Sequence, residues 1–158
     1  MFPSNFDRLT LALLLTTVSL GAAQADGGGA RSAHLPKYQQ ECGACHLAYP
    51  PSLLPRASWG RVMGTLNLHF GTDASLDAAS VREISDWLQA HGGGARANAA
   101  AAQDRITQSA WFLRDHGPGE IAPSLWKRAA IGSAANCTAC HRQAEQGRFD
   151  EHDIIIPG

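Results

Sequence analysis

The four cysteines of this 158-residue chain form two copies of one short motif, C-x-x-C-H. In this motif each thiol adds to one vinyl group of a porphyrin, and the adjoining histidine is held beneath the iron as its proximal ligand. The spacing therefore predicts two covalently attached c-type hemes. The residues that would hold them are Cys42, Cys45 and His46 for the first heme, and Cys137, Cys140 and His141 for the second.

Paired cysteines have other uses, which remain as alternatives. An exported chain could form two disulfides, a Cys2His2 set could bind zinc, and an exported C-x-x-C pair could act as a redox dithiol. A zinc site would have to explain two copies of the immediately adjacent histidine. A dithiol enzyme would have to explain the same histidines without a thioredoxin-like βαβ pattern. Heme attachment accounts for all four cysteines and both histidines.

The second axial position of each iron decides the chemistry. An open position predicts ligand binding or catalysis, and a position filled by a side chain predicts electron transfer. The candidates outside the two motifs are His34, His69, His91, His116, His152 and Met63.

The segment after the first motif predicts a helix that begins at Arg56 and ends at Gly71. Its apolar residues at helical spacing are Trp59, Val62, Met63, Leu66 and Phe70. Because His69 shares that apolar stripe, we predict it as the distal ligand of the first heme. Met63 is the alternative ligand, although its place on the stripe also suits core packing.

A second helix is predicted from the capping box over residues 80–83 to the glycines at 92–94. Ile84, Trp87 and Leu88 would form its apolar face, and His91 continues that face. A histidine in the last turn is also favoured by the helix dipole. We therefore interpret His91 as a structural residue.

A third helix is predicted from about Asp104 to the break at residues 117–119. Ile106, Ala110 and Leu113 would lie on one face, which His116 continues. We predict His116 as the distal ligand of the second heme, on a helix that precedes its attachment motif. The remaining histidines, His34 near the start of the mature chain and His152 in an acidic tail, are interpreted as surface residues.

The first 25 residues have the layout of a secretory signal peptide. Arg8 provides a basic flank, residues 9–20 are apolar, and Ala23 and Ala25 form a small-x-small cleavage site. We predict cleavage after Ala25 and export to the periplasm. An uncleaved anchor is the alternative, but the apolar run is short for a full membrane span. No later segment is apolar enough to cross a membrane.

The composition limits the function and suggests two lobes. The chain has 13 Lys+Arg, 14 Asp+Glu and a net charge of −1, which argues against a disordered tail protein and against nucleic-acid binding. A low-complexity linker over residues 92–103 separates an N-terminal lobe, 26–95, from a C-terminal lobe, 104–158. Lobes of this size bury little core unaided, so each should form around its heme. The predicted fold is mainly α.

These residues resemble the small exported diheme cytochromes c of bacteria. The resemblance rests on E-C-G-A-C-H-L-A-Y-P-P-S-L-L-P at 41–55, H-F-G at 69–71, W-F at 111–112, His116, A-N-C-T-A-C-H at 135–141 and F-D-E at 149–151. It implies a first lobe similar to class I cytochromes c and a more irregular second lobe. It also implies six-coordinate, bis-histidine hemes, ligated by His46 with His69 and by His141 with His116.

The function implied by this coordination is electron transfer and not catalysis. With two histidines on each iron no position is open for substrate, and one-electron shuttling remains. The resemblance implies a membrane cytochrome b and an oxygen-binding monoheme cytochrome c as redox partners. Two other functions stay open: a heme enzyme or gas binder with one vacant distal position, and a heme-free zinc or structural module.

Overall fold

The computed structural model describes residues 34–94 and 102–158. The predicted signal peptide, 1–25, and most of the predicted linker, 92–103, lie outside these ranges. The described chain forms four α-helices and several single 3₁₀ turns, and its two ranges contain no β-strand. The mainly α class predicted from the sequence is therefore confirmed. None of the helices in the described ranges is long and apolar enough to cross a membrane.

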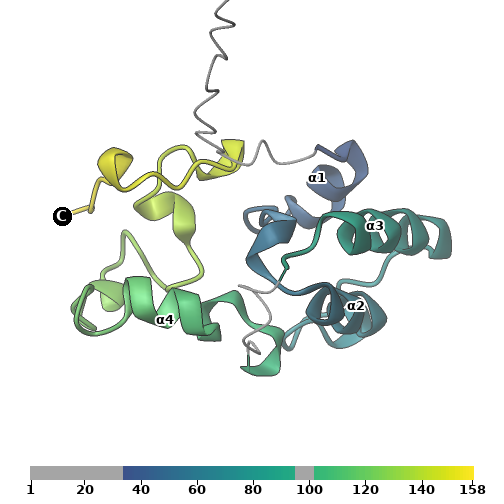
Figure 1. The fold of residues 1–158 in the computed structure, drawn as a ribbon, viewed down its shortest axis with the longest axis horizontal. Coiled ribbons are helices and arrows are strands. Elements are labelled where there is room, and N and C mark those ends of the chain that lie inside the picture. Colours follow the sequence, from purple (N-terminus) through teal and green to yellow (C-terminus); the bar gives the residue numbers. More distant parts are fainter. Residues whose placement is uncertain (1–33, 95–101) are drawn as a thin grey trace, which may run out of the picture.

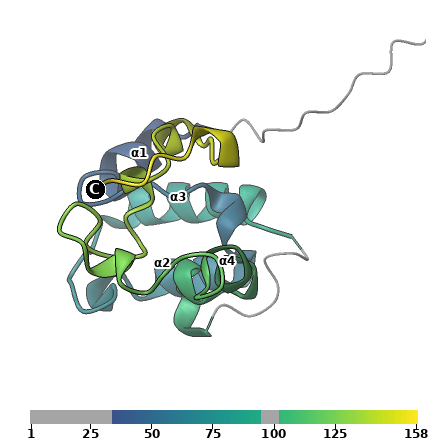
Figure 2. The same cartoon turned by 90° about the vertical axis from the view of Figure 1, so that its left-hand side faces the viewer.

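The first three helices form one side of the molecule. They are α1 (Pro36–Cys42), α2 (Arg56–Gly64) and α3 (Ala78–His91). Figure 1 and Figure 2 both show α3 between α1 and α2. Trp59, Val62 and Met63 of α2 and Ile84 and Leu88 of α3 are buried in a common core.

The helix predicted over residues 56–71 is shorter in the structure, because α2 ends at Gly64. Glycine is a poor helix former, and the Thr65 hydroxyl donates a hydrogen bond to the Arg61 carbonyl at 2.9 Å as the backbone leaves the helix. A separate 3₁₀ turn, Leu66–Leu68, follows. His69 therefore lies beyond this turn and not in the last turn of an α-helix.

The start of α3 also differs from the prediction. The capping residue is Asp77, whose carboxylate accepts hydrogen bonds from the backbone N–H groups of Ala79 and Ser80. Ser80, predicted as the cap, lies inside the helix and donates its hydroxyl to Asp77 at 2.6 Å. An aspartate caps as well as a serine does, and the two alanines that follow it favour helix. The predicted end of the helix, before Gly92, is confirmed.

The helix predicted from Asp104 begins later, as α4 (Ala110–His116). Asp104 has a φ of 56°, which a helix does not tolerate, and two 3₁₀ turns precede the capping residue, Ser109. The predicted apolar face was also wrong in part. Leu113 is 55% exposed, whereas Phe112 is buried.

The second side of the molecule, residues 102–158, contains α4 and little other regular structure (Figure 1). After Gly117 the chain forms only 3₁₀ turns. Ile106 and Phe112 belong to the same buried cluster as the core of the first three helices. The two sides, called here the first half (34–94) and the second half (102–158), therefore share one core.

Polar contacts also join the two halves. The Tyr49 hydroxyl donates to the Ala135 carbonyl at 2.8 Å, and the Trp111 indole donates to the Leu53 carbonyl at 3.4 Å. An ion pair joins Arg61 to Asp104 at 2.6 Å.

The first glycines of the predicted linker are packed and not free. The Gly92 N–H closes α3 on the Leu88 carbonyl, and the Gly93 N–H donates to the Leu54 carbonyl, both at 2.7 Å. Both glycines are buried. A side chain at Gly92 would begin 2.8 Å from Arg56 Cγ, so glycine permits this close approach.

Candidate heme sites

The first attachment motif lies at the end of α1, where the helix stops at Cys42. His46 follows in an exposed turn, and its Nδ1 lies 2.7 Å from the Leu47 carbonyl. Since a carbonyl can only accept, Nδ1 carries the proton and Nε2 keeps its lone pair for a metal. The hydrogen bond thus assigns the tautomer that a heme ligand requires.

His69 is held opposite His46 by a tight turn. The His69 carbonyl accepts the N–H of Thr72 at 3.0 Å, and the Leu66 carbonyl accepts the N–H of Ala74 at 2.9 Å. Within this turn Phe70 has a φ of 50° and Gly71 a φ of 100°. A bulky residue rarely adopts positive φ, so the turn stores backbone strain beside the histidine.

The rings of His46 and His69 lie near each other and nearly parallel, with centres 6.1 Å apart and planes inclined by 19°. An imidazole nitrogen binds a metal at about 2.0–2.1 Å, and the ring centre lies roughly 1 Å further, so two rings across one metal should be about 6 Å apart. The observed separation fits a single iron between these two rings.

A cavity of about 450 Å³ surrounds this pair. Its wall contains both cysteines of the first motif and apolar core residues, among them Leu54, Val62, Met63 and Leu88. Cofactor sites have volumes of this order and are mostly apolar. Met63, the alternative ligand, is a buried wall residue, and the ring that faces His46 is that of His69.

The second motif and α4 form a similar pair. His141 follows the turn Cys137–Ala139, and its ring centre lies 6.0 Å from that of His116, at the end of α4. The two planes are inclined by 56°. The Nδ1 atoms of both rings are buried and have no hydrogen-bond partner among the described residues. As at the first site, the separation of the two ring centres fits one metal between the imidazoles.

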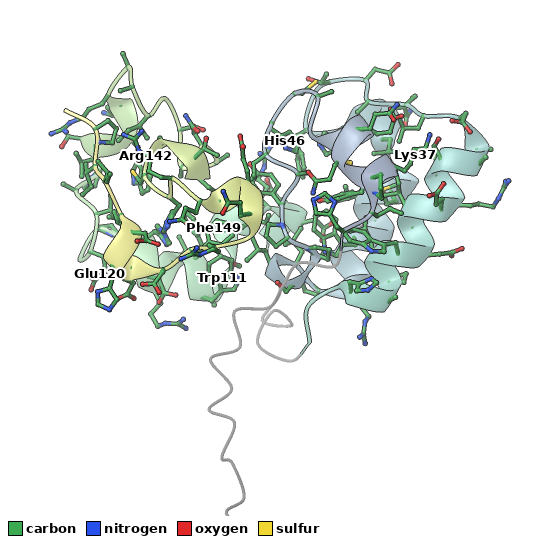
Figure 3. All side chains as sticks on the ribbon, turned by 90° about the horizontal axis from the view of Figure 1, so that it is seen from above. Lys37, His46, Trp111, Glu120, Arg142 and Phe149 are labelled. Atoms are coloured by element: carbon green, nitrogen blue, oxygen red, sulfur yellow. The ribbon has the colours of Figure 1, made fainter. Side chains whose placement is uncertain are left out.

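Aromatic rings position both second-site histidines. Phe112 lies one helical turn before His116 and stacks on it, with ring centres 4.4 Å apart and planes 5° from parallel. Phe149 meets His141 edge-on at 5.4 Å. Figure 3 shows Phe149 and Trp111 toward the margin of the second half that faces His46. These contacts limit how far either imidazole can rotate.

Burial changes the ionisation of several groups at the two sites. Burial lowers the pKa of His69, His116 and His141, which keeps them in the form that binds a metal. Burial also raises the pKa of Cys42 to about 11. A redox dithiol depends on a lowered thiol pKa, so Cys42 lacks that property.

The other uses of the cysteines receive no support from the geometry. All four thiols lie in the described ranges and none forms a disulfide. Within those ranges, no group of three or more His, Cys, Asp or Glu side chains is arranged to hold a metal ion.

The remaining histidines lie apart from the pairs. His91 is exposed at the end of α3, with its Nδ1 2.8 Å from the Trp87 carbonyl, and it packs against the Trp87 ring. His34 and His152 are exposed.

Two residues at the first site were missed from the sequence. Tyr49 stacks on His46 with ring centres 5.0 Å apart, and burial raises its pKa to about 12, so its hydroxyl remains a donor. Arg105 lies over the Phe70 ring, 4.3 Å from its centre, and lines the same cavity. Arg105 reaches the site from a segment distant in sequence, and Tyr49 lies three residues after His46, outside the helical stripes on which the sequence analysis relied.

Comparison with known proteins places these sites in a family. A family model described as dihaem cytochrome c matches residues 38–149. The solved structure of a diheme cytochrome c from Rhodobacter sphaeroides is 41% identical, with a TM-score of 0.67, and covers 76% of this chain and 100% of that chain. A diheme cytochrome from Shewanella baltica OS155 is 37% identical, with a TM-score of 0.67, covering 78% of this chain and 93% of that one.

A crystal structure described as DHC purified from Rhodobacter sphaeroides is 43% identical, with a TM-score of 0.63, and covers 73% of this chain and 96% of that chain. A search of curated proteins returned no match. The family match and these similarities agree with two attachment motifs and two facing histidine pairs in one mainly helical chain. The chain belongs to the dihaem cytochrome c family, carries two c-type hemes and serves in electron transfer.

Proposed function

We propose that this protein is a periplasmic electron carrier in which each heme iron is held between two histidines. His46 and His69 would ligate the first heme, and His141 and His116 the second. The observation that carries this proposal is the separation of the paired rings, 6.1 Å and 6.0 Å between centres. Both values suit one metal between two imidazoles.

The protein groups keep both axial positions filled. Bound heme supplies a one-electron couple between ferric and ferrous iron. The lowered pKa of His69, His116 and His141 keeps these imidazoles neutral and available as ligands near pH 7. Phe112 and the strained turn at Phe70 hold the distal rings in place. A filled sixth position excludes exogenous ligands, which makes this chain a carrier and not an enzyme.

The proposed axial ligands also set the range of the reduction potentials of the two hemes. Imidazole on both sides, without a methionine ligand, predicts comparatively low reduction potentials. Met63 is buried in the wall of the first cavity and packs there as a core residue.

The location and partners extend the proposal. The signal-peptide features of residues 1–25 support export to the periplasm, with cleavage after Ala25. The proposed redox partners are a membrane cytochrome b and an oxygen-binding monoheme cytochrome c. With 13 basic and 14 acidic residues the chain has little net charge for long-range steering. A small, transient contact suits such partners.

Carbon monoxide addition to the fully reduced protein tests the ligation. We expect no change in absorbance at either heme of the wild type. His69→Ala should open one position and give a carbon monoxide adduct at about half the heme. His116→Ala should do the same at the other half, and His91→Ala is the matched control that should bind none. Carbon monoxide binding to half the heme of the wild type would instead support a gas-binding or catalytic function.

A further inference from the structure

Tyr49 is placed between the two heme-attachment motifs. Its ring stacks on His46, with centres 5.0 Å apart and planes 25° from parallel. Its hydroxyl donates to the carbonyl of Ala135 at 2.8 Å, two residues before Cys137 and 86 residues along the chain from Tyr49. One side chain thus contacts the proximal histidine of the first site and the segment that carries the second motif.

The backbone of Tyr49 is fixed as well as its side chain. The Tyr38 hydroxyl donates to the Tyr49 carbonyl at 2.7 Å, and Tyr38 is only 2% exposed. Pro50 and Pro51 follow and are both buried. Because its carbonyl, ring and hydroxyl are all held, Tyr49 offers His46 a rigid surface.

The stack of Tyr49 on His46 and the hydrogen bond of His46 restrain the imidazole in different ways. The bond from Nδ1 to the Leu47 carbonyl determines which ring nitrogen is protonated. The face of Tyr49 limits rotation of the imidazole plane. Groups that orient a metal-binding histidine also affect the properties of the metal that it binds.

The cavity shows why this position matters. His46 and His69 line it together with Ala135 and Cys137 of the second half. The second attachment segment is therefore part of the wall of the first site, and Tyr49 lies at this junction, where it lines the same cavity.

We propose that Tyr49 is a positioning residue that sets the plane of the His46 imidazole and ties it to the second attachment segment. This inference rests on the proposed function, in which His46 is an axial ligand and Cys137 attaches the second heme. The ring sets the orientation through its stack on His46. The hydroxyl maintains it by anchoring the ring to the 135 carbonyl.

The test uses the exported diheme protein and two readouts of the first heme. Electron paramagnetic resonance of the oxidised protein reports the orientation of the axial imidazoles, and a spectroelectrochemical titration gives the two reduction potentials. The first-heme signal is identified as the one that changes in His69→Ala. Tyr49→Leu removes the stack, and Tyr49→Phe removes only the hydrogen bond. Trp111→Phe is the control, because it removes another bond between the halves, to Leu53, from a ring that is not in contact with His46.

We expect Tyr49→Leu to shift the g-values and the potential of the first heme, and Tyr49→Phe to shift or broaden the same signal to a smaller extent. Trp111→Phe should leave the first-heme signal unchanged. If Tyr49→Leu does not retain both hemes, Tyr49→Phe decides the matter by the same readouts.

An unchanged first-heme signal in the Tyr49 variants, or an equal shift in Trp111→Phe, would overturn the inference while leaving bis-histidine ligation intact. A wild-type protein with a high-spin signal from either heme would overturn the ligation and the inference together.

Discussion

The ring of His46 lies within 19° of parallel to the ring of His69, across a gap of 6.1 Å between centres. The second pair, His116 and His141, has nearly the same separation, 6.0 Å, but a plane angle of 56°. The two sites therefore match in spacing and differ in orientation. The energies of the iron d orbitals depend on the relative orientation of two axial imidazoles, so oxidised protein should give two distinct low-spin resonance signals. A single overlapping signal from both hemes would contradict this expectation.

Arg105 should raise the reduction potential of the first heme. Its guanidinium stacks on Phe70, next to His69, at the wall of the first cavity. A positive charge favours the ferrous state, which carries one positive charge less. We expect Arg105→Gln to lower the potential of the first heme by an amount on the order of tens of millivolts, since a partly solvated charge contributes about 1 kcal/mol or less.

A potentiometric titration of both hemes checks this effect of Arg105. Arg82→Gln is the control, because Arg82 is exposed on α3 and does not line the first cavity. It removes the same charge from the chain. Equal shifts in both variants would show that net charge, and not the position of Arg105, is responsible.

Ser109 should stabilise the helix that carries His116. Its buried hydroxyl accepts the N–H of Phe112 at 3.3 Å and donates to the Ile106 carbonyl at 2.7 Å. Ser109→Ala should cost about 1–2 kcal/mol, the loss of a helix cap together with an unpaired buried N–H. Ser124→Ala is the matched control, since Ser124 begins a turn without a side-chain cap bond. Urea denaturation followed by circular dichroism measures both, and equal losses would contradict the capping role.

The ion pair of Asp104 should make stability depend on pH. Hydrogen bonds from the Arg61 guanidinium lower the pKa of Asp104 below its ordinary value. A carboxyl group with a lowered folded-state pKa stabilises the protein above its unfolded-state pKa, and this contribution is lost as the pH falls through the folded-state value.

We therefore expect Asp104→Asn to be less stable than wild type at pH 7, with a difference that shrinks below the ordinary aspartate pKa of about 3.9. Urea denaturation of both proteins at pH 7 and at a pH below about 3.9 measures this difference in the free energy of unfolding. Asp86→Asn on α3 is the control, because Asp86 is exposed and forms no ion pair with another described residue. A constant Asp104→Asn difference across this range would show that the ion pair does not contribute.

The positions of His69 and His116 opposite the motif histidines could be predicted from the sequence, but the elements that present them could not. Apolar periodicity predicted one helix over residues 56–71. In the structure the helix ends at Gly64, where the Thr65 hydroxyl bonds to the Arg61 carbonyl. The helical spacing also predicted Leu113 on the apolar face, but in the structure Leu113 is exposed and Phe112 is buried. Periodicity reports local order and does not register the backbone conformations that interrupt it, such as the positive φ of Asp104 ahead of α4.

The contact of Tyr49 with the second half could not be predicted from the sequence either, because it joins distant positions. Its partner carbonyl at Ala135 is 86 residues away, and no local pattern connects the two positions. The same holds for Arg61 and Asp104, which are 43 residues apart. The attachment motifs were predictable because covalent heme chemistry demands adjacent residues.

The second half follows Gly117 with single turns and no longer helix. Such turns supply few cooperative backbone hydrogen bonds, so we expect the order of residues 118–158 to depend strongly on the heme that Cys137 and Cys140 would hold. Heme attachment and folding are then coupled for these residues: we expect them to be cut readily by a protease before the porphyrin is linked, and to resist the same protease afterwards.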